Sequence, residues 1–165
     1  YDYARAARVF PKSEKTVIGF GLYAESADDG RLEVDVMDHM GSRPVKLAID
    51  VQHHIMSSVM AGKEEYSKCG VFVPDQWHDV EIRIDSAKQC YDVLLNGNTV
   101  VSTGKFAENA STVERIEFRT GPYRMADQRI FDQYREIPRY NPDLAGSDVP
   151  APISAFSIGY LKTGL

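Results

Sequence analysis

Three features that define other classes of protein are scarce in this chain: cysteine, basic charge and long apolar runs. The 165 residues include two cysteines and have a formal net charge of −5, with no long basic segment. Such a charge disfavours non-specific binding to nucleic acid or to an anionic membrane, so we expect neither as a partner. No apolar run approaches the ~18 residues that span a bilayer, so we expect no transmembrane helix.

Motifs of several common chemistries are also missing. The chain has no phosphate-binding glycine loop, no zinc-ligand spacing and no Gly-x-Ser-x-Gly nucleophile elbow. Cys69 and Cys90 match no metal or redox spacing. They are compatible with one disulfide in an oxidising compartment, and Cys90, inside an extended run, is also compatible with a buried unpaired thiol.

Length and composition indicate one ordinary globular domain over residues 1–165. Hydrophobic residues make up 43% of the chain and charged residues 26%, as in soluble domains with a single core. The chain begins at Tyr1 rather than at methionine. We therefore expect a mature form or a domain cut from a longer protein, from which a leader can have been removed.

The segment from Trp77 to Val101 has the clearest local pattern. Apolar and charged side chains alternate after Trp77, with one side formed by His78, Val80, Ile82 and Ile84. This period of two predicts a strand with one buried face. A second extended run covers 91–95, and Asn96-Gly97 then supplies the two φ > 0 residues of a type I′ hairpin turn before the chain returns at 99–101.

Further short strands, separated by turn residues, are predicted along most of the chain. They are expected at 16–24, 32–36, 45–51, 55–60, 70–73, 113–119 and 153–161. Tyr1 to Arg8 is compatible with one helical turn, or with an edge strand that Pro11 ends. Gly19 and Gly21 fall on one face of their strand, where something must approach the backbone closely. Roughly nine or ten short strands without a helical period indicate an all-β sandwich or barrel.

One segment, 121–150, interrupts this pattern. It has no alternation, and it contains four prolines (Pro122, Pro138, Pro142 and Pro150). Residues 119–140 contain five arginines against three acids, a local charge of +2 in a chain of −5. An irregular stretch of this length inside a compact domain is usually a functional element or an interface.

The central hairpin resembles that of the concanavalin A-like lectin/glucanase superfamily in its laminin-G-like form, where a Trp opens a strand and an Asn-Gly turn closes the next. The surrounding segments are similar as well: Arg8-Val-Phe-Pro11, Gly30-Arg-Leu-Glu-Val-Asp-Val36, Arg43-Pro-Val-Lys-Leu47, Arg115-Ile-Glu-Phe-Arg-Thr-Gly121 and Phe156-Ser-Ile-Gly-Tyr160. Together they resemble the jelly-roll modules that accompany the catalytic β-propellers of secreted polysaccharide-degrading enzymes, including rhamnose–glucuronate lyases. The resemblance implies an antiparallel β-sandwich (jelly roll) in an accessory, carbohydrate-associated role, secreted or periplasmic.

Two catalytic alternatives follow from short motifs. Jelly-roll polysaccharide lyases of the alginate-lyase type have three strand motifs, which Arg31-Leu-Glu33, Gln52-His53-His54 and Phe118-Arg-Thr-Gly-Pro-Tyr123 resemble in the same order. In that interpretation Gln52, His54, Arg119 and Tyr123 form the catalytic set for β-elimination on a uronate-containing glycan. Glycoside hydrolases of the superfamily use Glu-x-Asp-x-x-Glu, which Glu33-Val-Asp35 with Asp38 approaches.

Sugar binding without catalysis requires an aromatic face and a few polar groups. Arg119, Tyr123 and Arg124 are the predicted carbohydrate-binding residues, because arginine selects acidic sugars by bidentate pairing. Trp77 is interpreted as core or rim packing. The Arg/Tyr-rich segment is also typical of a docking surface for a neighbouring catalytic domain, which we favour over sugar binding.

Calcium is the one cofactor that the resemblance raises. Oxygen ligands are available from Asp28-Asp29-Gly30 and from Asp143 or Asp148, although the chain has no contiguous calcium-loop pattern. The sequence therefore predicts a non-catalytic accessory module that contacts a polysaccharide or a neighbouring catalytic domain, with a small polysaccharide lyase as the alternative.

Overall fold

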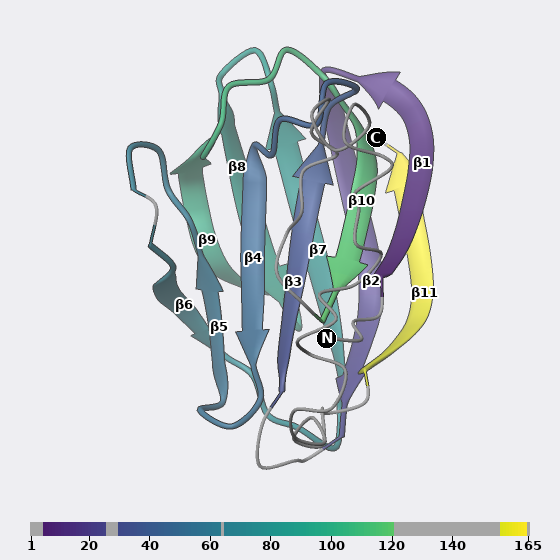
Figure 1. Cartoon of the computed structure of the whole chain (residues 1–165), viewed down its shortest axis with the longest axis vertical. Helices are drawn as coiled ribbons and strands as arrows, with labels where there is room; N and C mark the ends of the chain where they lie inside the picture. Colours follow the sequence, from purple (N-terminus) through teal and green to yellow (C-terminus); the bar gives the residue numbers. More distant parts are fainter. Residues whose placement is uncertain (1–4, 26–29, 64, 121–155, 165) are drawn as a thin grey trace, which may run out of the picture.

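The computed structural model describes residues 5–25, 30–63, 65–120 and 156–164, which form two antiparallel sheets packed face to face (Figure 1). The six-stranded sheet has the order β1 (Arg5–Ser13), β10 (Val113–Arg119), β3 (Arg31–Met37), β4 (Val45–Asp50), β5 (Ile55–Ser58) and β6 (Ser67–Val71). The five-stranded sheet has the order β11 (Phe156–Gly164), β2 (Lys15–Ala24), β7 (Trp77–Asp85), β8 (Cys90–Leu95) and β9 (Asn98–Lys105). The predicted all-β antiparallel sandwich is confirmed.

Alternation along the strands builds the core. Phe20 on β2 lies opposite Val80 on β7, and side chains that lie directly opposite each other share a face of the sheet. Both are buried. Phe20 also meets Phe118 of the other sheet edge to face, with ring centroids 5.0 Å apart, so this contact joins the two layers.

The turn between β8 and β9 is the predicted one. Asn96 and Gly97 have φ values of 51° and 78°, as a type I′ turn requires. The Asn96 Oδ1 accepts the Asp79 backbone N–H at 2.9 Å, and its Nδ2 donates to His78 Nδ1 at 2.9 Å. The other ring nitrogen of His78 donates to the Val73 carbonyl at 2.7 Å. His78 is therefore a fully satisfied core histidine.

Three expectations need correction. The N-terminal segment is the predicted edge strand, but β1 continues through Pro11 to Ser13. Proline is tolerated there because an edge strand leaves one row of N–H groups unpaired, and the register shifts between Val9 and Ser13. The strand expected at 70–73 instead covers Ser67–Val71. Eleven strands are present among the described residues, more than the nine or ten expected.

The structure also bears on the pairing of the cysteines and on the presence of a membrane-spanning helix. Both cysteines are free and Cys90 is buried, which confirms the unpaired-thiol alternative for that residue. Within the described ranges no helix is long and apolar enough to cross a membrane.

Candidate functional site

A charged cluster lies on the outer face of the six-stranded sheet. Arg119 ends β10 and lies opposite Glu33 of β3, two positions from Asp35 on the same face. Its Nη2 is 2.6 Å from Asp35 Oδ2 and 2.5 Å from Glu33 Oε2, and its Nε donates to Asp35 Oδ2 at 3.2 Å. We call these three residues the Arg119 cluster.

Two of the three residues of the Arg119 cluster, Arg119 and Asp35, are hidden from solvent, which is unusual for the outer face of a sheet. Arg119 is 1% exposed and Asp35 is fully buried. Burial raises the pKa of Asp35 above its usual range, although the hydrogen bond and charge of Arg119 oppose that rise. Burial alone lowers the pKa of Arg119, but the Asp35 and Glu33 carboxylates raise it above its ordinary value. The guanidinium therefore stays charged and engaged.

Further ion pairs extend the cluster toward the loop before β10. Arg43 Nη1 lies 3.7 Å from Asp35 Oδ2, and the Arg43 backbone N–H donates to Glu108 Oε2 at 2.7 Å. Lys46 of β4 pairs with Glu108 at 2.5 Å. On the other side, Arg5 of β1 pairs with Glu117 of β10 at 2.6 Å. These contacts fix the register of four neighbouring strands.

An exposed arginine and a half-buried tyrosine form a pair at the rim of this face. The Arg31 guanidinium lies over the Tyr66 ring, 4.7 Å from its centroid, and its Nε donates to Glu33 Oε1 at 3.1 Å. Burial, together with the Glu33 and Asp35 charges, raises the pKa of Tyr66 to about 12. The Arg31 side chain is 45% exposed. Its terminal nitrogens have no partner among the described residues, so they can receive an anionic group.

The predicted binding set is only partly within the described residues. Arg119 forms the buried cluster above, and its donors face two carboxylates of the chain itself. Tyr123 and Arg124 lie outside the described residues. Their assignment to glycan contact stays a prediction.

The lyase set is dispersed as far as it is described. Gln52 and His54 lie exposed in the turn between β4 and β5, and His54 has φ 55°. Strand β5 is three positions from β10 in the sheet, which puts roughly 14 Å between their axes. In this turn it is His53 that is engaged, with its Nδ1 2.8 Å from Asp50 Oδ2. Tyr123 lies outside the described residues.

The carboxylates of the hydrolase-like motif, Glu33, Asp35 and Asp38, all accept hydrogen bonds from groups of the chain itself. Glu33 and Asp35 hold Arg119, while Asp38 Oδ1 accepts the backbone N–H groups of Met40 and Ser42 at 2.9 and 2.8 Å. The acids considered for calcium (Asp28, Asp29, Asp143 and Asp148) lie outside the described residues. Within the part of the chain that is described, no group of three or more His, Cys, Asp or Glu side chains is placed to hold a metal ion.

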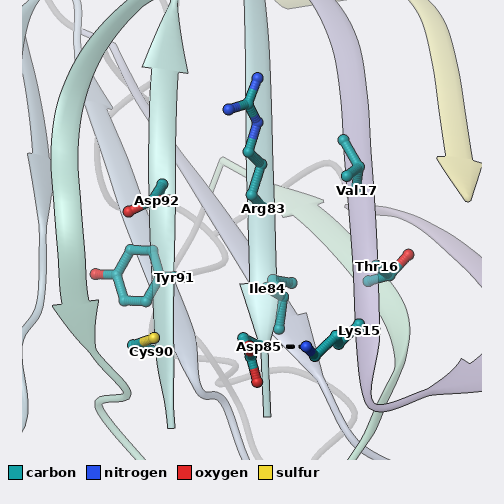
Figure 2. Close-up of a pocket in the computed structure, with 9 residues that line it drawn as sticks. All are labelled: Lys15, Thr16, Val17, Arg83, Ile84, Asp85, Cys90, Tyr91 and Asp92. Atoms are coloured by element: carbon teal, nitrogen blue, oxygen red, sulfur yellow. Dashed lines mark ion pairs between the residues drawn. The ribbon is translucent and has the colours of Figure 1, made fainter. Parts of the chain in front are cut away.

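A shallow hollow lies over β2, β7 and β8, lined by residues 15–17, 83–85 and 90–92 (Figure 2). Lys15 Nζ and Asp85 Oδ2 pair across it at 3.3 Å. The Cys90 thiol is buried, and the Tyr91 hydroxyl donates at 3.2 Å to the carbonyl of Val59, the residue that follows β5. These side chains are used in packing and pairing, so the hollow offers no evident chemistry.

One exposed aromatic residue differs from its sequence interpretation. The sequence predicts core or rim packing for Trp77, yet Trp77 is 55% exposed on the outer face of the five-stranded sheet. The alternation of apolar and charged residues after Trp77 already indicates this exposure. Because His78 and Val80 point inward, Trp77 must share the outer face with Asp79.

The two packed sheets define an antiparallel β-sandwich of the jelly-roll class. A family model described as "Sialidase-like, CBM domain" matches residues 1–129, and the chain belongs to this family of carbohydrate-binding modules. No curated protein matches the sequence significantly.

Solved structures agree on the fold. A sialidase with 22% identity and a TM-score of 0.76 covers 99% of this chain, which spans 14% of that protein's length. A tetrameric galectin from the ball sponge Cinachyrella sp. has 9% identity and a TM-score of 0.62, and the match covers 97% and 99% of the two chains. A single mutant of congerin II has 17% identity and a TM-score of 0.51, with coverage of 71% and 92%. The resemblance to modules of rhamnose–glucuronate lyases stays a prediction.

Proposed function

We propose that this domain is the accessory glycan-binding module of a larger, secreted carbohydrate-active enzyme and that it contacts acidic glycans at the rim of the six-stranded sheet. Membership of a carbohydrate-binding family supports the class of ligand. The observation that supports an acidic ligand is Arg31, which lies over the Tyr66 ring with its terminal nitrogens available. A guanidinium held in this way can pair with a sugar carboxylate through two parallel hydrogen bonds.

The predicted contacts after β10 fit this proposal. Tyr123 and Arg124 follow Arg119 closely in sequence, and Arg119 lies opposite Glu33, the residue to which Arg31 is bonded. Arg119 itself contributes by holding the ends of β3 and β10 together rather than by offering free donors. No observation among the described residues favours the lyase alternative, so the domain is proposed as a binding module.

The test is binding to sialylated and uronate-containing glycans, measured by isothermal titration calorimetry with Arg31→Gln. Arg83→Gln is a matched control, because Arg83 is similarly exposed on the other sheet and its Nε is likewise bonded to a carboxylate two residues away, Glu81, at 2.6 Å. Charge-assisted hydrogen bonds contribute about 1.5–3 kcal/mol, so Arg31→Gln should weaken binding roughly tenfold to a hundredfold. Arg83→Gln should leave it unchanged.

Two further variants, Tyr123→Ala and Arg124→Gln, test the predicted contacts that follow β10. Each should weaken binding if its side chain touches the glycan. Equal losses in Arg31→Gln and Arg83→Gln would mean that only overall charge matters. An absence of binding to every acidic glycan by the unaltered domain would refute the acidic-ligand proposal.

A further inference from the structure

Three aromatic rings gather on the outer face of the five-stranded sheet, opposite to the Arg119 cluster. The strands β11, β2 and β7 are neighbours in this sheet (Figure 1). Tyr23 of β2 lies directly across from Trp77 of β7, and Tyr160 comes from the edge strand β11. The Tyr23 and Trp77 ring centroids are 5.6 Å apart, with planes inclined by 48°. Trp77 is 55% exposed and Tyr160 is 40% exposed. We call these three residues the aromatic platform.

Glycines explain why two of the rings lie against the sheet. A Cβ at Gly159 would lie 2.8 Å from Trp77 Cζ3, and a Cβ at Gly21 would lie 3.1 Å from Tyr160 Cδ1 and Cε1. The inner faces of both rings therefore rest on backbone, which confirms the close approach predicted at Gly21. The close approach predicted at Gly19, the other glycine of this face, is wrong, because a Cβ there would meet nothing within 4 Å. A register shift in β11 between Ile158 and Leu161 brings Gly159 and Tyr160 to this place.

Polar groups surround the aromatic platform at the level of the rings. The Tyr160 hydroxyl donates to Asp79 Oδ1 at 2.9 Å, which holds that carboxylate beside the exposed ring. Lys162 Nζ lies 5.2 Å from the centroid of the Tyr160 ring. Asp79 Oδ2 has no partner among the described residues, so it can accept hydrogen bonds from a ligand.

We propose that the aromatic platform is a second glycan-binding site, which takes a neutral hexopyranose by stacking on Trp77 and by hydrogen bonds to Asp79. A pyranose presents a face of C–H groups to an aromatic ring and hydroxyl donors at its edge, and the platform offers the complement of both. Glu81 is paired with Arg83 at 2.6 Å, but Asp79 places a negative charge beside the rings, which disfavours a sugar carboxylate at this position. The site thus differs in ligand from the Arg31 rim on the other sheet.

The size of the aromatic platform also fits one or two sugar rings better than a protein partner. A Trp or Tyr side chain has 150–250 Å² of surface, so the exposed fractions of Trp77 and Tyr160 amount to roughly 200 Å². A stable protein–protein interface needs about 800 Å² from each partner. A sugar ring needs far less.

The chain provides its own reporter for the test. Trp77 is its single tryptophan, so its fluorescence emission reports directly on the platform. Titration with neutral soluble polysaccharides (a β-glucan, a galactomannan and a xyloglucan) should give a saturable change in emission for at least one of them. Affinity electrophoresis in gels that contain the same polysaccharide should show retardation.

Three variants locate the site. Trp77→Ala should weaken retardation by about tenfold or more, since stacking contributes on the order of 1.4 kcal/mol. Asp79→Asn should weaken it by a smaller factor, because the amide keeps one acceptor but loses the charge. Arg31→Gln, on the other sheet, should leave neutral-glycan binding unchanged. Urea unfolding of each variant, followed by circular dichroism, shows that a loss of retardation is not a loss of fold.

Several outcomes would overturn the inference. One is that no neutral glycan changes the fluorescence emission of Trp77. Another is that Trp77→Ala is still retarded in the gel. A third is that Arg31→Gln abolishes neutral-glycan binding together with acidic-glycan binding. Acrylamide quenching of Trp77 in a longer natural chain that contains this domain is a separate check. Full protection there, compared with the isolated domain, would assign the platform to a domain interface instead. Because acidic-glycan binding depends on Arg31 and neutral-glycan binding on Trp77, failure of one proposal leaves the other open.

Discussion

The Arg119 cluster gives a quantitative prediction about stability. Arg119→Met removes the guanidinium but keeps most of the side-chain volume, so it leaves Asp35 buried without its closest counter-charge. Removing one partner of a buried ion pair costs about 3–5 kcal/mol, because the remaining charge is uncompensated. We expect a loss in that range at neutral pH. This would be a large part of the roughly 5–15 kcal/mol by which a domain is usually stable.

The loss should depend on pH, with a sign that follows from Asp35. Its folded-state pKa is raised by burial above the usual 3.8. Between 3.8 and that higher value the folded state binds more protons than the unfolded state, so stability falls as pH rises through this window. In Arg119→Met the lowering influence of the guanidinium is gone, and the window extends to higher pH. The deficit relative to the unaltered chain should therefore be smallest near pH 4 and largest at pH 7 and above.

A double-mutant cycle with Asp35→Asn separates this cause from simple loss of packing. Urea unfolding, followed by Trp77 fluorescence and circular dichroism at about pH 4.5 and 7.5, gives the four free energies of unfolding. The double variant should recover roughly 1–3 kcal/mol relative to the sum of the single losses, because no unpaired buried charge remains at position 35. Asp35→Asn alone should cost less than Arg119→Met, since Glu33 still pairs with the guanidinium. Additive losses that do not change with pH would refute the reasoning.

Three further predictions concern other positions. Gly104→Ala places a Cβ 2.6 Å from Val101 Cγ1 and should cost about 1–3 kcal/mol by thermal unfolding, whereas Gly19→Ala, with nothing within 4 Å, should cost nothing. Gly97→Ala must adopt φ 78° and should cost about 1–2 kcal/mol in the same assay, and a wild-type midpoint would contradict the turn. The Tyr66 hydroxyl should ionise near pH 12 in the folded chain, whereas a tyrosine in the unfolded chain ionises near pH 10. The free energy of unfolding should therefore fall as pH rises above 10. A phenolate absorbance titration that Tyr66→Phe leaves unchanged above pH 11 would contradict this.

The strands could be predicted from the sequence because buried and exposed residues alternate at adjacent positions of a half-buried strand. The alternation after Trp77 and the Asn96-Gly97 pair are both local signals, and both are confirmed. The continuation of β1 through Pro11 was not predictable in this way. Whether a strand lies at the edge of its sheet depends on its partner, and β1 pairs with β10 from the far part of the chain.

The same limit applies to the candidate sites. The sequence around Arg119 predicts a sugar-binding role, but its partner Asp35 is 84 positions away. No local pattern reveals that pairing. Trp77 is the opposite case, because the alternation that assigned His78 to the core already placed Trp77 outside. The glycines that make room for the platform rings, however, lie on β2 and β11, and only the register shows them together with Trp77.

Neither outer face has the composition that stability alone would favour. A buried ion pair costs desolvation and is often less stabilising than apolar residues of similar volume. On the other sheet, an exposed Trp leaves in water apolar surface that a smaller residue would not have. The Arg119 cluster does fix register, because a slip of one residue would turn Arg119 into the core. The aromatic platform packs the edge strand β11 onto the sheet, since Trp77 rests on Gly159 and Tyr160 on Gly21, while the register of β2 and β7 is set by the apolar residues on their inner face. Packing accounts for the inner faces of these rings, and the proposed glycan would cover their outer faces.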